Sequence, residues 1–237
     1  MKKKKELVIG SLGLFKNQCT LEVLAQIKTC DIVFSHMMDD ETSKFLKKIS
    51  TNIKVIRNLK PDKMAKAVVS AFKEFNKICF LTYGNPMFLN ATTGYLNREA
   101  LKADIKITVL NAVSSFDAII SIMGLSKFSD IGIRVVDIAS CLKNVVFTSE
   151  MDTLFFMVGD FNLKGNEKYK NNFIKKLTTV YPQDANFFMI DAKSIANNND
   201  TLLKGNVCDL AKYFNTVNNR TTMFLPAIKN KGKNQNF

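Results

Sequence analysis

The stretch Leu7-Val-Ile-Gly-Ser-Leu-Gly-Leu14 decides the fold. Its first three residues predict a short buried strand, and Gly10 and Gly13 predict a tight turn directly after it. Thr20 then suits the N-cap of a helix whose apolar residues recur at helical spacing. Asp31-Ile-Val-Phe34 predicts the next buried strand. A strand, a turn, a helix and a second strand in this order favour an α/β layer with a parallel sheet.

The same alternation of short strands and helices continues as far as Leu110. Pro61 suits the first turn of a helix, where its missing N–H costs nothing. Further strands are predicted at Ile53–Ile56, Ile78–Leu81 and Lys106–Leu110, and helices at Glu41–Ile49, Asp62–Phe75, Ala91–Ala103 and Ser114–Met123. We therefore predict an N-terminal α/β domain with a mostly parallel sheet.

The pattern changes after about residue 126, where predicted strands outnumber predicted helices. Strands are predicted at Ile131–Ile138, Asn144–Thr148, Thr153–Val158, Ala185–Asp191 and Thr221–Leu225, and helices at Glu167–Val180 and Asn206–Phe214. This pattern predicts a mixed α+β C-terminal domain. The predicted domains are residues 1–112 and 113–228, followed by a flexible tail at 229–237.

Composition narrows the classes of function. The chain has 237 residues and a formal charge of +13, which favours anionic partners and keeps RNA as an alternative substrate. Lysine accounts for almost all of the excess positive charge, and the chain has only four arginines. Sequence-specific recognition of bases through bidentate arginine contacts is therefore disfavoured. Lysine and asparagine codons are A/T-rich, which offers a second explanation for the charge. No apolar run is long enough to span a membrane, and the apolar stretch after the basic start is too short for a signal peptide, so we expect a cytoplasmic protein.

Histidine and cysteine usage argues against metal chemistry. The five cysteines form no C-x-x-C pair and are expected to be reduced thiols. His36 is the only histidine of the chain, so a site built on several imidazoles is excluded and no metal ligand is assigned. A hydrolase triad would depend on His36 alone. The acidic run Asp39–Glu41 that follows is expected to cap a helix.

Three turns lie directly after predicted strands, at Gly10–Gly13, Tyr83–Met87 and Asn111–Ser115. In an open α/β sheet, ligands bind beyond the carboxyl ends of the strands. Neither the complete G-x-G-x-x-G pattern nor the P-loop pattern is present, which argues against a nicotinamide dehydrogenase and a nucleoside triphosphatase.

These turns and their spacing resemble a known family, the class III S-adenosylmethionine (SAM) methyltransferases of the tetrapyrrole methylase type. The resemblance extends over about residues 6 to 227. It is carried by Leu7–Leu14, Thr20–Ile27, Asp31–Phe34, Tyr83-Gly-Asn-Pro-Met87, Asn111-Ala-Val-Ser-Ser115, Leu154–Gly159 and Thr221–Pro226. It implies a two-domain α/β fold, a folded cofactor in a cleft between the domains, and a homodimer.

Position by position, the resemblance also implies the residues that bind SAM. Leu14 would lie beside the cofactor, Tyr83, Gly84, Asn85, Pro86, Met87 and Phe88 would surround its methionine portion, Ser114 and Ser115 would contact it at a helix start, and Met157 and Val158 would flank the adenine. Methyl transfer is an in-line displacement that depends on position, so no catalytic triad is required.

Within this family, the chain is most similar to the borosin-type peptide backbone N-methyltransferases. The resemblance implies a peptide or other soluble acceptor, with backbone amide N-methylation as one option, and Arg57 and Tyr83 as catalytic candidates. The segment around Arg57 lacks the tyrosine found in those enzymes, and Ala91–Thr93 resembles the diphthine-forming branch instead. The alternatives are RNA or tetrapyrrole methylation and a non-catalytic SAM-binding module. Asn85 stands where the family usually has an acid or a histidine. This replacement either has no effect on cofactor binding or weakens it.

Overall fold

The computed structural model describes residues 4–36 and 39–228. The predicted tail at 229–237 lies outside the described residues. The chain divides into two units: the first contains the chain up to Ala118 together with Lys193–Asn198, and the second contains Ile119–Ala192 and the chain from Asn199 onwards. The expected boundary between residues 112 and 113 stays a prediction.

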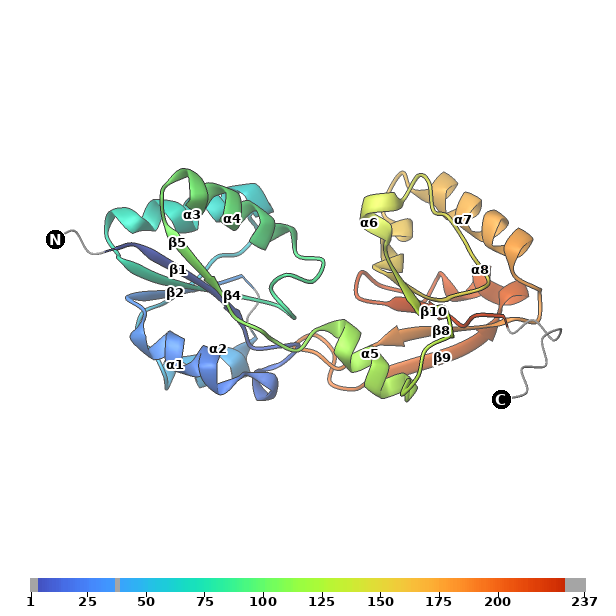
Figure 1. Ribbon diagram of the computed structural model, residues 1–237, viewed down its shortest axis with the longest axis horizontal. Coiled ribbons are helices and arrows are strands. Elements are labelled where there is room, and N and C mark those ends of the chain that lie inside the picture. Colours follow the sequence, from blue (N-terminus) through green and yellow to red (C-terminus); the bar gives the residue numbers. More distant parts are fainter. Residues whose placement is uncertain (1–3, 37–38, 229–237) are drawn as a thin grey trace. The chain divides into compact units, whose positions relative to one another are not determined.

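The sheet of the first unit is parallel throughout, as the sequence predicts. Its strand order is β3-β2-β4-β1-β5, so β1 and β4 lie side by side at the centre (Figure 1). The strands are β1 (Glu6–Ser11), β2 (Ile32–Ser35), β3 (Ile53–Val55), β4 (Lys77–Thr82) and β5 (Lys106–Val109). Because all five strands run the same way, their carboxyl ends share one edge of the sheet.

Helices cover both faces of this sheet (Figure 1). The helices α3 (Pro61–Ser70) and α4 (Ala91–Lys102) lie on one face, and α1 (Leu21–Thr29) and α2 (Asp40–Lys47) lie on the other. Alternate residues of β1 therefore enter different cores: Leu7 packs with the α3 and α4 layer, and Val8 with the α1 and α2 layer. Burial on both faces explains why these strands form continuous apolar runs rather than alternating ones.

The helix ends of this unit follow local side-chain chemistry. The hydroxyl of Thr20 accepts a hydrogen bond from the N–H of Val23 at 3.2 Å, which makes Thr20 the predicted N-cap of α1. Short 3₁₀ turns occur at η1 (Lys16–Gln18) and η2 (Ala71–Lys73). The helix predicted to reach Phe75 therefore ends as an α-helix at Ser70 and tightens into η2.

The sheet of the second unit is mixed, as predicted, with the order β6-β7-β10-β8-β9. Only β6 and β7 pair in parallel; the other neighbours are antiparallel. Its strands are β6 (Ile133–Asp137), β7 (Asp152–Phe156), β8 (Asn186–Asp191), β9 (Thr201–Asn206) and β10 (Thr222–Leu225). The remaining elements are α5 (Ser115–Met123), which carries the chain from one unit to the other, α6 (Ile138–Cys141), η3 (Val158–Asn162), α7 (Glu167–Val180), η4 (Val207–Asp209) and α8 (Leu210–Tyr213).

A cluster of phenylalanine rings forms the centre of this second core. Phe173 of α7 lies 4.8 Å from Phe161, 5.0 Å from Phe147, 5.5 Å from Phe155 and 5.9 Å from Phe214, measured between ring centroids. Tilted and edge-on contacts at these distances are the favoured arrangement of aromatic rings. The long helix α7 is therefore fixed to the sheet through one residue with many partners.

Two strand predictions in this unit are wrong. Asn144–Thr148 is not a strand, because side chains rather than a neighbouring strand bond its carbonyls: the Arg134 guanidinium donates to Val146, and the Tyr181 hydroxyl donates to Thr148 at 2.7 Å. The strand β9, conversely, is missing from the prediction. Its residues are almost all exposed and show no alternation of apolar and polar residues, although they form a regular antiparallel ladder with β8.

Within the described residues, no helix is long and apolar enough to cross a membrane.

Candidate active site

Three loops leave the carboxyl edge of the first sheet, after β1, β4 and β5. The N–H of Gly84, after β4, donates to the carbonyl of Gly13, after β1, at 3.0 Å. Both glycines have positive φ, 64° for Gly84 and 75° for Gly13, a conformation that is unfavourable for residues with a Cβ. The hydroxyl of Ser11 accepts the N–H of Gly13 at 2.9 Å and holds the first turn. The two turns therefore form one backbone assembly.

Asn85 connects the loop after β4 to the third loop, which follows β5. Its Nδ2 donates to the carbonyl of Ala112, after β5, at 3.1 Å, and its Oδ1 accepts the N–H of Met87 at 2.9 Å. A carboxylate at this position would accept the second bond but could not donate the first. The departure of Asn85 from the family pattern thus has a structural role, since it joins the loop after β4 to the loop after β5.

The start of α5 is capped by its own side chains. The carboxylate of Asp117 accepts the N–H of Ser114 at 2.7 Å and its hydroxyl at 2.6 Å. Ser114 is buried, so its side chain is committed to this cap, whereas Ser115 is partly exposed in the first helical turn. An anion near this helix start would meet the Asp117 carboxylate, so binding there depends on the remaining N–H groups of the first turn.

The other residues of the loop after β4 differ in exposure. Pro86 is buried, Met87 is 61% exposed, and the ring of Phe88 lies 6.1 Å from that of Phe116 in α5. Leu14 is buried, and its N–H donates to Gln18 Oε1 at 2.7 Å. The predicted residues Leu14, Tyr83–Phe88 and Ser114 thus lie in loops of the first unit at one edge of its sheet, and Ser115 begins the helix α5 that follows the last of these loops.

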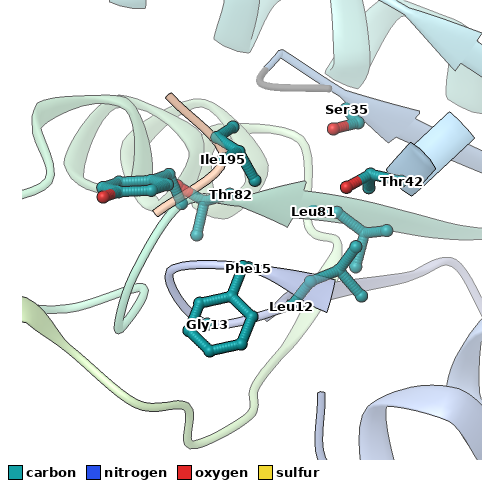
Figure 2. A pocket seen from close by; sticks show the side chains of 9 residues that line it. Leu12, Gly13, Phe15, Ser35, Thr42, Leu81, Thr82 and Ile195 are labelled. Atoms are coloured by element: carbon teal, nitrogen blue, oxygen red, sulfur yellow. The ribbon is translucent and has the colours of Figure 1, made fainter. Parts of the chain in front are cut away.

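A small pocket opens beside these loops, at the ends of β1, β2 and β4 (Figure 2). Its apolar wall consists of Leu12, Phe15, Leu81 and Ile195. Its polar wall consists of the hydroxyl-bearing side chains Ser35, Thr42, Thr82 and Tyr83, and Gly13 completes the lining. It contains about 270 Å³ of space, including the part that is open to solvent.

Arg57 and His36 lie at the same edge, in different settings. Arg57 is exposed and follows Ile56, whose N–H donates to the carbonyl of Ser35 at 2.8 Å. The strand β2 lies between the strands that precede Arg57 and Tyr83, so two strand spacings, about 10 Å, separate these strands. Neither Arg57 nor His36 lines the pocket described above.

His36 packs against the core. Its ring stacks on Phe80 at 5.5 Å, and among the described residues its Nδ1 has no hydrogen-bond partner. Burial lowers the pKa of His36, because the imidazolium would lose its hydration, and a backbone hydrogen bond at Leu81 offsets this only partly. His36 is therefore neutral at pH 7. The neighbouring Asp39 is a helix cap, as expected: its carboxylate accepts the N–H of Thr42 at 2.7 Å.

Met157 and Val158 belong to the second unit, and their predicted placement on a strand is wrong. The strand β7 ends at Phe156, because Met157 adopts a left-handed conformation with φ of 60° and Val158 begins η3. The side chain of Val158 is fully buried, and its N–H donates to Thr221 at 3.2 Å. A positive φ at a residue other than glycine is a strained conformation of a kind that clusters at ligand sites.

Comparison with known proteins decides the family. The model of the tetrapyrrole (corrin/porphyrin) methylases matches residues 14–138, which is more than half of the 237 residues. The chain belongs to the tetrapyrrole methylase family. It is a SAM-dependent methyltransferase, since members of this family use SAM as methyl donor.

The structural comparison agrees with this family. The crystal structure of uroporphyrin-III C-methyltransferase from Thermus thermophilus is similar to this methylase with a TM-score of 0.69 and 12% sequence identity, over 97% of this chain and 99% of that chain. At this identity the likeness shows a shared fold. The chain has no significant match among curated proteins.

Several residues at this edge of the methylase are missing from the sequence prediction. Ser35 and Thr42 line the pocket, and Ile195 reaches it from a segment far along the chain. The N–H of Ile195 donates to the carbonyl of Leu14 at 2.9 Å. Ser35 could have been found as the polar residue that ends a buried strand, but no local pattern indicates Ile195.

Proposed function

We propose that this methylase binds SAM with the loops that follow β1, β4 and β5 and transfers its methyl group to a peptide or another soluble acceptor. One observation carries the proposal: hydrogen bonds from Gly84 to Gly13 and from Asn85 to Ala112 tie these three loops together. Backbone groups from three strand ends thus lie at the edge where α/β sheets bind ligands.

The residues present fit this cofactor. Gly84 has no Cβ, and a Cβ built there would have only Leu14 Cδ2 within 4 Å, at 3.8 Å, so a ligand can approach the backbone. When bound, SAM supplies an electrophilic methyl group on a sulfonium sulfur. Carbonyl oxygens of the loops would favour the sulfonium charge, and N–H groups in the first turn of α5 would bind a carboxylate. The chain's own contribution is to hold donor and acceptor in line at about 3 to 3.5 Å.

Within this proposal, Arg57 and Tyr83 are candidates for orienting the acceptor. Both follow strands at the same edge of the sheet, on either side of β2. Tyr83 also lines the pocket, whereas Arg57 does not. The peptide acceptor itself rests on the resemblance to backbone N-methyltransferases, and we propose a homodimer on the same basis.

Asn85→Ala should weaken SAM binding about five- to tenfold, because loss of both side-chain bonds releases the loop after β4 from the loop after β5. Isothermal titration calorimetry with SAM measures this directly. Asn52→Ala is a matched control: Asn52 Nδ2 donates to the carbonyl of Asp31 at 2.7 Å, at the opposite edge of the sheet. If both variants bind SAM like the parent, the three loops do not form the site.

Two further substitutions test the predicted contacts one by one. Tyr83→Ala removes a side chain that lines the edge, and Ser115→Trp places a bulky ring in the first turn of α5, so each should reduce SAM affinity about tenfold or more. Ser121→Trp is the control, because Ser121 is an exposed residue of the same helix. Unchanged affinity in both test variants would refute these contacts.

The acceptor class can be measured without knowing the acceptor. A cell extract is separated into peptide, RNA and small-molecule fractions, and each is incubated with the enzyme and SAM that carries a deuterated methyl group. We expect label in the peptide fraction by mass spectrometry. Label in the tetrapyrroles would support the second candidate, which the family and the Thermus thermophilus enzyme favour. Label in RNA, with binding that falls steeply with salt, would contradict both.

A further inference from the structure

Two cysteines meet in the layer between the first sheet and the helices α1 and α2. Cys79 is the third residue of β4 and is 1% exposed. Cys30 directly follows α1, packs against the same apolar cluster and is partly exposed. The two side chains share a hydrogen bond, although they are far apart in the sequence, and both thiols are free. A buried thiol and a more accessible thiol are thus in direct contact.

Backbone and side-chain bonds hold Cys30 beside β4. The N–H of Asp31, the next residue, donates to the carbonyl of Lys77 at 2.8 Å, and Asp31 Oδ2 accepts the N–H of Lys77 at 2.8 Å. Lys77 Nζ donates to Thr29 Oγ1, also at 2.8 Å. Lys77 begins the strand that contains Cys79. These bonds tie the end of α1 to the start of β4, so the contact between the two thiols is part of the fold.

The groups around Cys30 favour its thiolate form. The hydrogen bond with Cys79 lowers the pKa of Cys30 most, and the ammonium of Lys77 lowers it further. Burial and the carboxylates of Glu6 and Asp31 raise the pKa, but the favourable contacts outweigh them. Because the thiolate is the nucleophilic form of cysteine, Cys30 is the more reactive sulfur of the pair.

Cys79 has the opposite character. The hydrogen bond with Cys30 and almost complete burial raise the pKa of the Cys79 thiol well above its ordinary value, so this thiol keeps its proton. The pair therefore combines an accessible thiolate with a protected thiol next to it. Redox-sensitive cysteines have this arrangement, in which the thiolate attacks the oxidant and the neighbouring thiol resolves the product.

The other three cysteines differ from Cys30. Burial raises the pKa of Cys19 to about 11 and also raises the pKa of Cys141. Cys208 is exposed, and its Sγ donates to Asp209 Oδ2 at 3.7 Å. Cys19 lies near enough to Cys79 for its charge to affect the pKa of that thiol, so Cys19 is the internal competitor for Cys30.

We propose that Cys30 and Cys79 form a peroxide-sensitive pair that oxidises to a disulfide. The Cys30 thiolate attacks one oxygen of hydrogen peroxide, the O–O bond breaks, and the departing hydroxide takes up the proton that Cys30 released. The Cys79 sulfur then attacks the sulfur of the Cys30 sulfenic acid, so that the S–S bond forms and the S–O bond breaks. The second hydroxide takes up the Cys79 proton. Two thiols and one peroxide thus give one disulfide and two water molecules.

This inference is independent of the proposed cofactor site. Cys30 precedes β2, so it lies at the edge of the sheet opposite to the loops that follow β1, β4 and β5. The pair therefore stands or falls whether or not the protein binds SAM.

The test maps the disulfide in the full chain. The reduced protein is treated with hydrogen peroxide, the remaining thiols are alkylated with iodoacetamide, and trypsin digestion follows without reductant. Trypsin places Cys30 in the peptide 29–44 and Cys79 in the peptide 78–98. We expect mass spectrometry to find these peptides joined, with the loss of two hydrogen atoms, and separate after treatment with dithiothreitol. A link of either cysteine to another cysteine, or no link between the two, overturns the proposal.

Trapping experiments test the order of the two steps. Cys79→Ser should stop the reaction at the sulfenic acid of Cys30, which dimedone traps, and Cys79→Ala replaces this variant if it does not fold. In the parent, Cys30 should react with peroxide about tenfold or more faster than Cys19, because a much smaller fraction of Cys19 is thiolate. Sulfenic acid on Cys19 rather than Cys30, or equal rates for the two, contradicts the assignment of Cys30 as the attacking sulfur.

Cys208→Ser provides the matched control. It removes an exposed cysteine of the second unit and should form the link between Cys30 and Cys79 at the rate of the parent. Cys30→Ser should leave Cys79 unoxidised at the same dose of peroxide. Oxidation of Cys79 in Cys30→Ser at the parent's rate would show that Cys79 reacts by itself and would overturn the pair.

Discussion

Gly84→Ala should lower the affinity for SAM about 5- to 30-fold. Gly84 has φ of 64°, and this left-handed conformation costs about 1–2 kcal/mol for a residue with a Cβ. The alanine variant would relax its loop in the free protein, so binding would have to restore the strained conformation at that cost. Calorimetric titration of SAM into the variant measures the loss.

Gly124→Ala is a closely matched control for this substitution. Gly124 follows α5 with φ of 62°, and a Cβ there would meet nothing within 4 Å. Both alanines therefore impose the same backbone cost, but only Gly84 lies in a proposed cofactor loop. We expect similar losses of stability and an affinity for SAM that changes only in Gly84→Ala. An affinity within twofold of the parent in Gly84→Ala would remove the loop after β4 from the site.

Phe173→Ala should destabilise the second unit by about 3–5 kcal/mol, the usual cost of deleting a buried aromatic ring. Phe173 is 2% exposed and contacts four other rings, so its removal leaves a cavity that no single neighbour can fill. Denaturant unfolding followed by circular dichroism, with hydrogen exchange to assign the loss to this unit, gives the measurement.

The control for the aromatic cluster is Phe128→Ala. Phe128 also belongs to the second unit but is 37% exposed, and it should change the free energy of unfolding by less than about 1 kcal/mol. Equal effects of the two substitutions would mean that the rings around Phe173 repack freely. In that case the cluster would not fix α7 to the sheet.

Much of the first unit could be predicted from the sequence because its signals are local. Thr20 caps α1 as predicted, and two buried strands, β1 and β4, end in turns with glycine. These two turns and Asn111–Ser115, in order along the chain, indicated the edge where Gly84 and Asn85 bond to neighbouring loops. The sequence could not show those bonds, since the partner of Asn85 is a backbone carbonyl that carries no signature of its own.

The strand that the sequence prediction missed and the strand that it wrongly placed also have physical causes. Leu202 and Leu203 are adjacent and both exposed, so β9 lacks the alternation that reveals a half-buried strand. Val145 is buried in the core although its segment is irregular, which gave Asn144–Thr148 the apolar character of a strand. The cofactor role of Met157 stays a prediction; what the sequence could not indicate is its left-handed conformation.

The return of Lys193–Asn198 to the first unit affects how the protein is made. The first sheet is complete once β5 has been synthesised, but Ile195 leaves the ribosome only after another stretch of chain, on the order of several seconds later. Until then the carbonyl of Leu14 lacks its partner and the pocket lacks a wall. A nascent chain can therefore fold its N-terminal sheet early, yet this pocket is complete only when most of the second unit has been translated.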